Sequence, residues 1–278
     1  MSTPEPLVEG LAFGESPRWF DGRLWLADWG AGEVLTVDAE GRTEVVVRVD
    51  GLPICFDRLP DGRLLVVAGR DGRLLRREPD GTLVPHADLA ALAPYPWNEV
   101  VTDARGNAYA NTIGFDFPGG TFAPGSVALV TPDGTARLVA GDLAFPNGMA
   151  LTPDGRTLIV AESYAGQLTA FDVAADGALG ARRVWAEVAD SAPDGICLDA
   201  SGAVWYGDVP NQCAVRVAEG GRVLDRIELD QGCFATALGG PDGRTLHMVT
   251  MRWDPGALAG GPRTGNVMTV RVPVPGVA

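Results

Sequence analysis

The stretch Asp61–Val66 reads Asp-Gly-Arg-Leu-Leu-Val, a turn dipeptide followed by a short apolar and β-branched run. Asp-Gly readily adopts the positive backbone angle that a tight hairpin turn requires, and the run after it has the composition of a β-strand. Related units recur along the chain at 21–26, 105–109, 154–160, 201–205 and 242–247. Their turn glycines, Gly22, Gly62, Gly106, Gly155, Gly202 and Gly243, are 40, 44, 49, 47 and 41 residues apart.

Each of these periods has the length of one propeller blade. Further Asp-Gly turns fall inside the periods at 71–72, 80–81, 133–134 and 176–177, so that each period holds about four short strands. A β-sandwich is the alternative for a run of hairpins, but it gives no reason for six near-equal periods. The sequence therefore predicts an all-β fold, a six-bladed β-propeller with about four antiparallel strands per blade, in one domain over residues 1–278.

Composition excludes several classes of function. The formal charge is −14, from 36 acidic against 22 basic residues, which argues against nucleic acid or an anionic membrane surface as a partner. The chain has no lysine, so Schiff-base and P-loop chemistry that needs one is excluded. Its two histidines, His86 and His247, are too few for a three-histidine zinc site, and no Gly-x-Ser-x-Gly motif supports a serine hydrolase.

The cysteines and the chain termini bear on location. The four cysteines (Cys55, Cys197, Cys213 and Cys233) are widely spaced without a Cys-x-x-Cys pair, and we expect reduced thiols. No secretion signal is recognised at the N-terminus, and no apolar run approaches the ~20 residues of a membrane helix. We therefore expect a cytoplasmic protein, a monomer or weak homodimer, acting on a small-molecule substrate.

Oxygen-bearing side chains occupy one position of the repeat. Counting back eight residues from the turn glycines, or seven in the first unit, gives Glu15, Ile54, Asn98, Asn147, Asp194 and Ala235. Equivalent positions in a propeller are related by rotation about the central channel, so the four polar side chains are expected to converge on its axis. The alternative is that Asn147-Gly148 and Asp194-Gly195 are ordinary turn dipeptides.

A convergent set of two carboxylates and two amides has the chemistry of a cation site. Glu15, Asn98, Asn147 and Asp194 are all hard oxygen donors, and their summed charge of −2 balances a divalent ion. We expect one divalent cation, Ca²⁺ before Mn²⁺, Mg²⁺, Zn²⁺ or Fe²⁺. Four protein donors leave open positions for water and substrate, as a catalytic metal needs.

Three segments resemble the SMP-30/gluconolactonase family, which includes regucalcin and sugar-acid lactonases. They are Gly14–Trp19, Phe145–Ala150 and Pro193–Asp199, and the similarity runs through essentially the whole chain in the same order. The resemblance implies a six-bladed propeller, one divalent metal in the central channel and hydrolysis of a lactone.

The resemblance also assigns roles to residues. It implies that Glu15, Asn147 and Asp194 are metal ligands, and that Asn98 binds the metal or the substrate. Asp194 and Asn98 are then the candidate catalytic residues. In the mechanism that follows, the metal polarises the lactone carbonyl, Asp194 activates water, and Asn98 and Asn147 orient the substrate and stabilise the oxyanion.

The chain departs from the family pattern around the ligand. Sugar lactonases often have an arginine directly before the third-unit asparagine, whereas this chain has Trp97 before Asn98. The expected substrate-binding residues are aromatic: Phe56, Tyr95, Trp97, Phe115, Phe145 and Phe234. The Phe- and Gly-rich segment 114–122 is a candidate lid. We therefore expect a substrate less polar than a free sugar lactone; the alternatives are an ester or phosphotriester hydrolase on the same metal site, or a non-catalytic calcium- or ligand-binding propeller.

Overall fold

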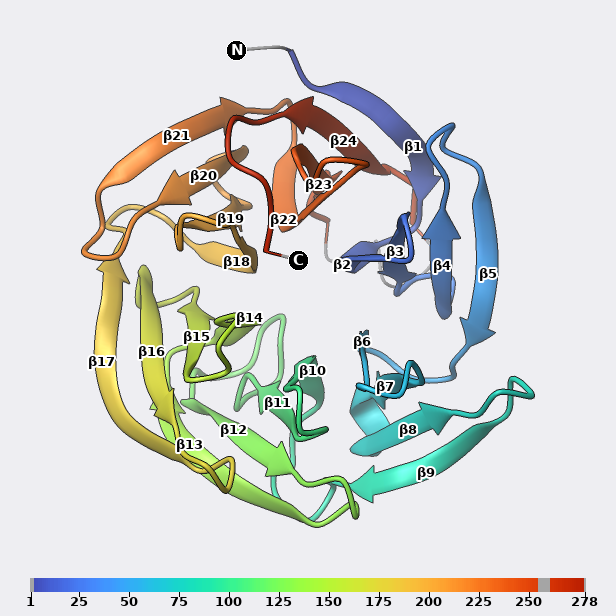
Figure 1. Ribbon diagram of the computed structural model, residues 1–278, viewed down its shortest axis with the longest axis vertical. Coiled ribbons are helices and arrows are strands. Elements are labelled where there is room, and N and C mark those ends of the chain that lie inside the picture. The colour runs from blue at the N-terminus through green and yellow to red at the C-terminus, as the bar shows by residue number, and fades with distance from the viewer. Residues whose placement is uncertain (1–2, 255–260, 278) are drawn as a thin grey trace.

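Six four-stranded antiparallel sheets close into a ring in the computed structural model, which describes residues 3–254 and 261–277 (Figure 1). The predicted six-bladed β-propeller is confirmed. Blades 1 to 3 contain β2 (Gly14–Phe20), β3 (Arg23–Asp28), β4 (Glu33–Val37) and β5 (Thr43–Arg48); β6 (Ile54–Arg58), β7 (Leu64–Ala68), β8 (Arg73–Arg77) and β9 (Leu83–Asp88); β10 (Trp97–Thr102), β11 (Ala108–Thr112), β12 (Gly125–Val130) and β13 (Ala136–Leu143). Blades 4 to 6 contain β14 (Pro146–Leu151), β15 (Thr157–Glu162), β16 (Gln167–Val173) and β17 (Leu179–Glu187); β18 (Pro193–Leu198), β19 (Val204–Asp208), β20 (Cys213–Val217) and β21 (Val223–Glu228); β22 (Gly232–Gly239), β23 (Thr245–Met251), β24 (Gly265–Arg271) and β1 (Glu5–Leu11).

The repeated glycines lie in the turn between the first and second strand of each blade, as the sequence predicts. Gly62, for example, connects β6 to β7 with a φ of 87°, and Gly202 connects β18 to β19 with a φ of 81°. All six turn glycines have positive φ, which explains why glycine recurs at this spacing. Among the described residues the only helical element is a 3-10 turn, η1 (Gly69–Asp71), and no helix could span a membrane.

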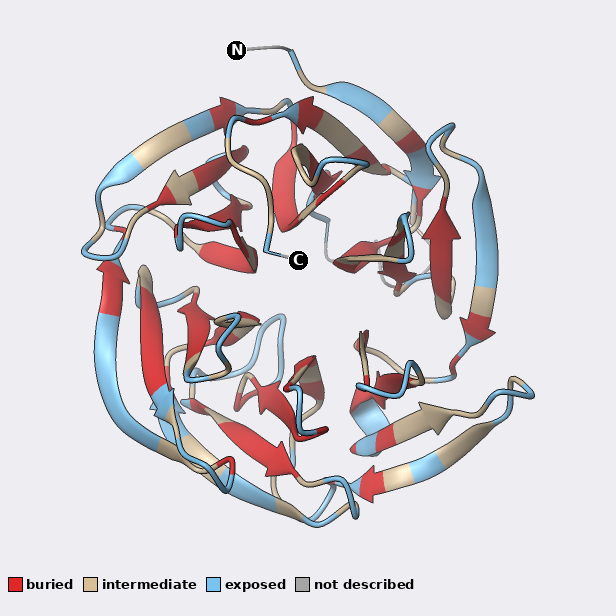
Figure 2. Ribbon diagram, in the orientation of Figure 1, coloured by how far each residue is buried: buried red, intermediate tan, exposed pale blue. Residues whose placement is uncertain are grey.

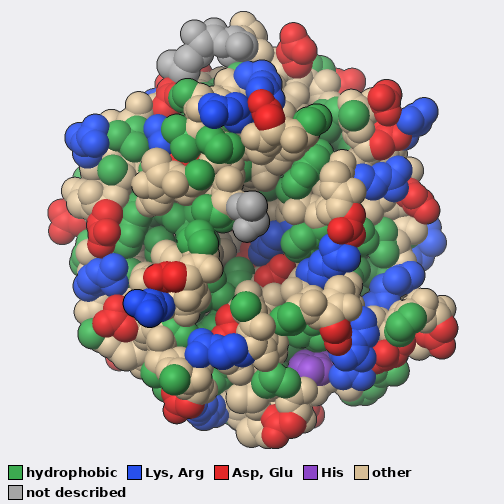
Figure 3. Space-filling view, in the orientation of Figure 1, with side chains coloured by type: hydrophobic (Ala, Val, Ile, Leu, Met, Phe, Trp, Pro, Cys, Tyr) green, Lys and Arg blue, Asp and Glu red, His purple; other side chains and the backbone are tan. Residues whose placement is uncertain are grey.

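The ring is closed by strands from both ends of the chain. β1, from the N-terminal region, pairs antiparallel with β24 as the outermost strand of blade 6. Near the other end, the backbone N–H of Gly276 donates to the carbonyl of turn residue Gly243, and that of Ala200 donates to Pro275. This end of the chain therefore lies on the face that carries the Asp-Gly turns, and Figure 3 shows that face, with a hollow near its centre.

Burial decreases from the axis to the rim. The inner strands are mostly buried, whereas the outermost strand of each blade consists mainly of exposed and half-buried residues (Figure 2). The apolar clusters lie between neighbouring blades: one joins Trp185 of blade 4 to Tyr206 of blade 5, and another joins Leu74 of blade 2 to Val100 of blade 3. Because blade-to-blade packing supplies the core, the first strands can present polar side chains to the axis.

Candidate functional site

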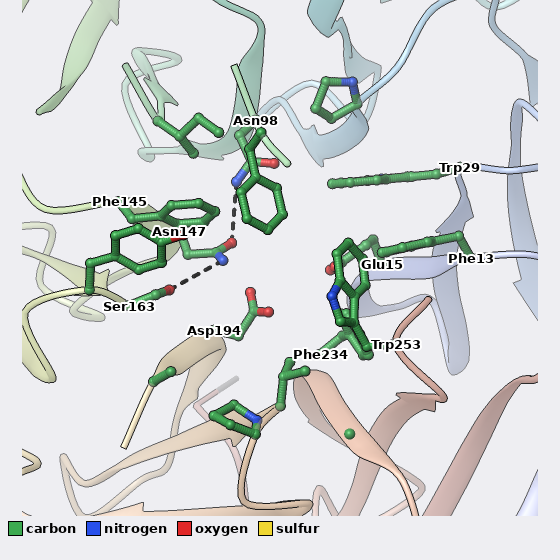
Figure 4. Close-up of a pocket in the computed structure, with 18 of the residues that line it drawn as sticks. Phe13, Glu15, Trp29, Asn98, Phe145, Asn147, Ser163, Asp194, Phe234 and Trp253 are labelled. Atoms are coloured by element: carbon green, nitrogen blue, oxygen red, sulfur yellow. Dashed lines mark hydrogen bonds between the residues drawn. The ribbon is translucent and has the colours of Figure 1, made fainter. Parts of the chain in front are cut away.

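A cavity of ≈ 910 Å³ opens at the end of the axis where the inner strands begin. Glu15, Asn98, Asn147 and Asp194 all line it, and they approach a common centre from different sides (Figure 4). They come from the first strands of blades 1, 3, 4 and 5, so residues almost 180 positions apart in the chain face the same space. The structure therefore brings together the four side chains that the repeat register singled out.

An irregularity in strand pairing marks each of these four positions. The ladder of the first two strands is interrupted between Glu15 and Arg18, between Trp97 and Glu99, between Pro146 and Met149, and between Pro193 and Ile196. In blade 2, by contrast, β6 pairs without interruption from Ile54 to Arg58, and Ile54 is buried in the core. Blade 6 has a similar interruption between Cys233 and Ala235, and there Phe234 lines the cavity. Bulges re-aim side chains, so they direct this position to the cavity, and the sequence makes it polar in four blades.

The turn-dipeptide alternative for Asn147-Gly148 and Asp194-Gly195 is wrong. Both pairs lie within strands, β14 and β18, and neither glycine has positive φ. A Cβ on Gly148 would lie 2.5 Å from the carbonyl oxygen of Asp194, and one on Gly195 would lie 2.4 Å from the Cβ of Ala235. Glycine is required here because adjacent inner strands approach each other too closely for a side chain.

A chain of hydrogen bonds links three of the blades at the cavity wall. The Asn98 amide donates to Asn147 Oδ1 over 3.2 Å, and the Asn147 amide donates to the Ser163 hydroxyl over 3.4 Å (Figure 4). Ser163 donates in turn to the carbonyl of Pro193, the residue before Asp194, over 2.8 Å. Asn98 and Asn147 are thus held relative to each other and to the backbone just before Asp194.

A further set of positioning groups, which the sequence analysis did not find, lies at the ends of the second strands. Asp28, Glu162 and Asp208 end β3, β15 and β19, and all three are buried. Each carboxylate accepts a backbone N–H two or three residues before a site residue: Asp28 from Phe13 at 2.9 Å, Glu162 from Ala144 at 2.6 Å and Asp208 from Ala192 at 3.5 Å. The signal was present, since these acids stand six or seven residues after the turn glycines.

In blade 3, Asn111 holds the backbone next to the site residues. Its side chain is fully buried, accepts the backbone N–H of Glu99 over 3.2 Å and donates to the carbonyl of Asn147 over 2.6 Å. It therefore fixes the backbone on either side of the contact between Asn98 and Asn147.

The two site carboxylates lack compensating charge. Burial raises the pKa of Glu15 well above its ordinary range, and the nearby carboxylates of Asp194 and Glu99 raise it further. Burial likewise raises the pKa of Asp194 well above its ordinary range, with Glu99 and Asp208 adding to the effect. Within the described part of the chain, the buried Oδ1 of Asp194 has no hydrogen-bond partner.

Beneath these groups Arg18 supplies one positive charge. It donates to Glu99 over 3.0 Å, and Glu99 also accepts the backbone N–H of Val100 and, at 3.4 Å, the hydroxyl of Ser16. Arg18 is thereby committed to Glu99 and leaves Glu15 and Asp194 without an ion-pair partner among the described residues.

This donor set fits a divalent cation. A buried, unpartnered carboxylate oxygen beside a second buried carboxylate is costly unless a cation is bound, and two amide side chains complete an all-oxygen set. Among the described residues no group of three or more His, Cys, Asp or Glu side chains is placed to hold a metal ion, so the donors here are two carboxylates with two amides.

The cavity walls are aromatic, but only some of the predicted residues form them. Phe115, Phe145 and Phe234 line the cavity. Phe56 and Trp97 do not, because both are fully buried in the cores beside blade 2, and Tyr95 also lies outside the lining. None of these three residues lines the cavity in this structure, and the side chains of Phe56 and Trp97 pack between blades. Phe117, in the candidate lid segment 114–122, does line it, together with four aromatic residues that the sequence analysis did not name: Phe13, Trp29, Tyr164 and Trp253.

The candidate lid lies in the loop between β11 and β12. Phe115 packs against Phe145 with ring centroids 5.6 Å apart, and Phe122 packs against Tyr164 at 5.9 Å. The segment is therefore packed over the blade 4 side of the cavity through its rings. Charged groups also line the cavity: besides the site carboxylates there are Asp116 and Asp230, and two arginines, Arg70 and Arg252, that make no ion pair with any described residue.

Comparisons with known proteins identify the relatives of this chain. The family model described as SMP-30/Gluconolactonase/LRE-like region matches residues 13–252. Pentonolactonase XacC of Haloferax volcanii is 29% identical over 89% of this chain and 84% of its own length, and a 6-deoxy-6-sulfogluconolactonase of Pseudomonas putida is 28% identical over 95% and 93%. The solved structure of regucalcin from Agrobacterium tumefaciens, described as a calcium-binding protein, superposes with a TM-score of 0.80 at 22% identity, covering 100% of this chain and 98% of that one.

Proposed function

The chain belongs to the SMP-30/gluconolactonase/LRE-like family, and from this premise we propose that it is a divalent-metal-dependent hydrolase that opens a lactone ring. The observation that carries the proposal is the convergence of Glu15, Asn98, Asn147 and Asp194 on one cavity, with a buried carboxylate oxygen left unpartnered. The names of the two curated relatives, both lactonases, support the reaction type.

We assign one divalent cation to the four oxygen donors. Glu15 and Asp194 would balance its charge, while Asn98 and Asn147 would complete the protein ligands. Ca²⁺ is the expected ion because all four donors are hard oxygens; Mn²⁺, Mg²⁺, Zn²⁺ and Fe²⁺ are the alternatives. A bound ion of this kind supplies Lewis acidity to a carbonyl and lowers the pKa of a water.

Asp194 is the proposed general base. Asp194 lines the cavity, and its buried Oδ1 has no hydrogen-bond partner among the described residues, so the carboxylate has an oxygen available to accept a proton from water. As the water oxygen forms a bond to the lactone carbonyl carbon, the water proton passes to Asp194. The carbon–oxygen bond of the ring then breaks, and Asp194 returns the proton to the departing ring oxygen, giving a hydroxy acid.

Asn98 and Asn147 are proposed to orient the substrate. Their amides are already held by each other and by Ser163, so their positions are set before a ligand arrives. An amide N–H placed beside the carbonyl oxygen stabilises negative charge that develops on it, an effect worth roughly 3 kcal/mol for a well-placed donor.

The walls of the cavity indicate a substrate less polar than a free sugar lactone. Eight aromatic side chains line it: Phe13, Trp29, Phe115, Phe117, Phe145, Tyr164, Phe234 and Trp253. Such walls bury apolar surface and offer few hydrogen bonds to sugar hydroxyl groups. An aromatic lining also suits an ester or a phosphotriester, and these remain alternative substrates for the proposed metal site. A propeller that binds calcium or a ligand without turnover is the remaining alternative.

The test is a substrate panel assayed against a panel of metals. The protein is freed of metal with a chelator and then assayed with Ca²⁺, Mn²⁺, Mg²⁺, Zn²⁺ or Fe²⁺ on lactones, aryl esters and a phosphotriester. We expect lactone hydrolysis that is lost on chelation and restored by one of the ions. Full activity after complete metal removal would contradict the proposal. Tight cation binding with no turnover of any substrate would favour the non-catalytic alternative.

A further inference from the structure

Two aromatic rings from opposite sides of the propeller meet at the mouth of the cavity. Phe117 belongs to the β11–β12 loop of blade 3, and Trp253 follows β23 of blade 6. Their ring centroids are 5.8 Å apart and their planes differ by 19°, which is a stacked arrangement. Blades 3 and 6 face each other across the ring (Figure 1), so this contact spans the channel.

The stacked pair lies between solvent and the oxygen donors. Phe117 and Trp253 line the same cavity as Glu15 and Asp194, but they are 43% and 39% exposed, whereas both carboxylates are buried. The two rings therefore lie on the solvent side of the cavity, where a substrate on its way to the carboxylates can contact them. Exposed aromatic side chains at this density are costly in water and indicate a surface that binds an apolar partner.

Each ring of the pair is backed by other aromatic side chains. Phe117 meets the edge of Phe145 at 5.0 Å. Trp253 meets Phe13 edge-on at 6.1 Å and lies 6.1 Å from Phe234. These neighbouring rings hold Phe117 and Trp253 in the orientation in which their flat faces meet.

We propose that Phe117 and Trp253 determine substrate specificity by binding a planar apolar substituent, such as an aryl group, carried by the lactone ring. The proposal rests on the proposed function for the reacting ring. The rings are too close to admit a third, because a three-ring stack needs about 7 Å between the outer two. Binding therefore separates them, and a flat aromatic group between them restores the lost stacking on both of its faces. A bare lactone carries no substituent that does so.

A matched set of lactones tests this inference. The substrates are δ-valerolactone, its δ-phenyl derivative and its δ-cyclohexyl derivative, which share the reacting ring and differ in the substituent. For the wild-type protein we expect the order phenyl, cyclohexyl, bare in kcat/KM. Phe117→Ala and Trp253→Ala should each lower the phenyl-to-bare ratio of kcat/KM roughly 10-fold, because the advantage of the phenyl group falls from two stacked contacts to one.

Two further variants serve as controls. Phe122→Ala removes a ring of the same loop that is 50% exposed but does not line the cavity, and it should leave the phenyl preference intact. Trp253→Phe should recover most of the preference, because it retains a flat ring. Equal kcat/KM for the phenyl and bare lactones in the wild type, or an equal fall for both in Phe117→Ala and Trp253→Ala, would overturn the inference.

Binding of lactams separates this inference from the proposed function. δ-Phenyl-δ-valerolactam and δ-valerolactam have the same shapes as the lactones but resist hydrolysis, and their affinities are measured by calorimetry. Tighter binding of the phenyl lactam that is lost in Trp253→Ala supports the aromatic subsite even if no lactone is hydrolysed. No difference between the lactams overturns the subsite, whatever the hydrolysis assay shows.

Discussion

At the level of single residues, the proposed function depends most on Asp194. It is one of the few acids in the described chain that is buried without a cationic partner, and one of its oxygens has no hydrogen bond. Buried carboxylates elsewhere are satisfied: Asp199 pairs with Arg216, and Asp28 accepts two backbone N–H groups. An acid that serves only the fold would have such partners, so Asp194 is better explained by a ligand.

Replacing Asp194 by Asn tests its role as the base. The amide keeps the shape and one oxygen donor, so much of the cation affinity should remain, while proton transfer is lost. We expect kcat/KM to fall roughly 10²–10⁴-fold. The control is Asp230→Asn, the same change in an exposed acid at the cavity mouth, which should alter kcat/KM about 2-fold or less. Unimpaired turnover in Asp194→Asn would remove this residue from the mechanism.

His247 gives a pH dependence of stability. Burial in β23, against the ring of Trp19, lowers the pKa of His247 from 6.5 to about 4. Because the unfolded chain takes up this proton first, the contribution is intact above pH 6.5 and is lost as the pH falls from 6.5 towards 4. At pH 5 the loss amounts to about 2 kcal/mol.

The measurement is urea unfolding of the wild type and His247→Gln between pH 7.5 and 5. The wild type should lose about 2 kcal/mol more than the variant over this range, whatever the absolute stability of each. Parallel pH profiles for the two proteins would show that His247 is not the titrating group.

At the level of elements, the first strands of blades 4 and 5 combine two features that place the site. A bulge turns Asn147 or Asp194 towards the axis, and the glycine that follows allows the next inner strand to approach. Gly195, in β18, lies against the backbone and side chain of Ala235 in β22. The site geometry therefore depends on strand-to-strand distance as much as on the ligand residues.

Gly195→Ala should disturb the site without touching a ligand directly. The new Cβ would lie 2.4 Å from the Cβ and 2.7 Å from the Cα of Ala235, so a strand must move. We expect a loss of about 1–3 kcal/mol in unfolding free energy together with reduced cation affinity. Gly180→Ala, whose new Cβ would meet nothing closer than 3.5 Å, is the control and should change the unfolding free energy by about 0.5 kcal/mol or less. Equal effects in the two variants would contradict this account.

For the whole molecule, the proposed cation site depends on closure of the ring. The donors come from four blades, and the ring is closed by pairing of β1 with β24 in blade 6. A cation held by all four donors can bind only when the ring is closed, so its binding free energy adds to the free energy of unfolding.

Thermal unfolding with and without a divalent ion checks this coupling. At a free Ca²⁺ concentration 100 times its Kd we expect about 2.7 kcal/mol of added stability, which is a rise in Tm of about 5 °C or more. Glu15→Gln, which removes one charged donor, should reduce the rise. A Tm that does not respond to Ca²⁺ or to the other ions of the panel would show that no cation is held by the folded ring.

The blade repeat and the register of the four polar side chains can be predicted from the amino-acid sequence alone. Both follow from local chemistry: Asp-Gly turns need positive φ, as at Gly62, and residues at one offset from those turns are carried to the same place in every blade. Asp28 and Asp208, whose carboxylates hold the loops, also stand at a fixed distance after the turn glycines. The same comparison of the repeats could therefore have identified them.

Which aromatic side chains face the cavity depends on tertiary packing. Phe56 and Trp97 look as suitable as Phe145 in the sequence, yet they pack between blades, while Phe13 and Trp253 reach the channel. The direction of a ring beside a bulge and the distance between loops on opposite blades result from packing of the closed ring. No local pattern encodes them, because the partners, such as Phe117 and Trp253, are brought together only when all six blades are in place.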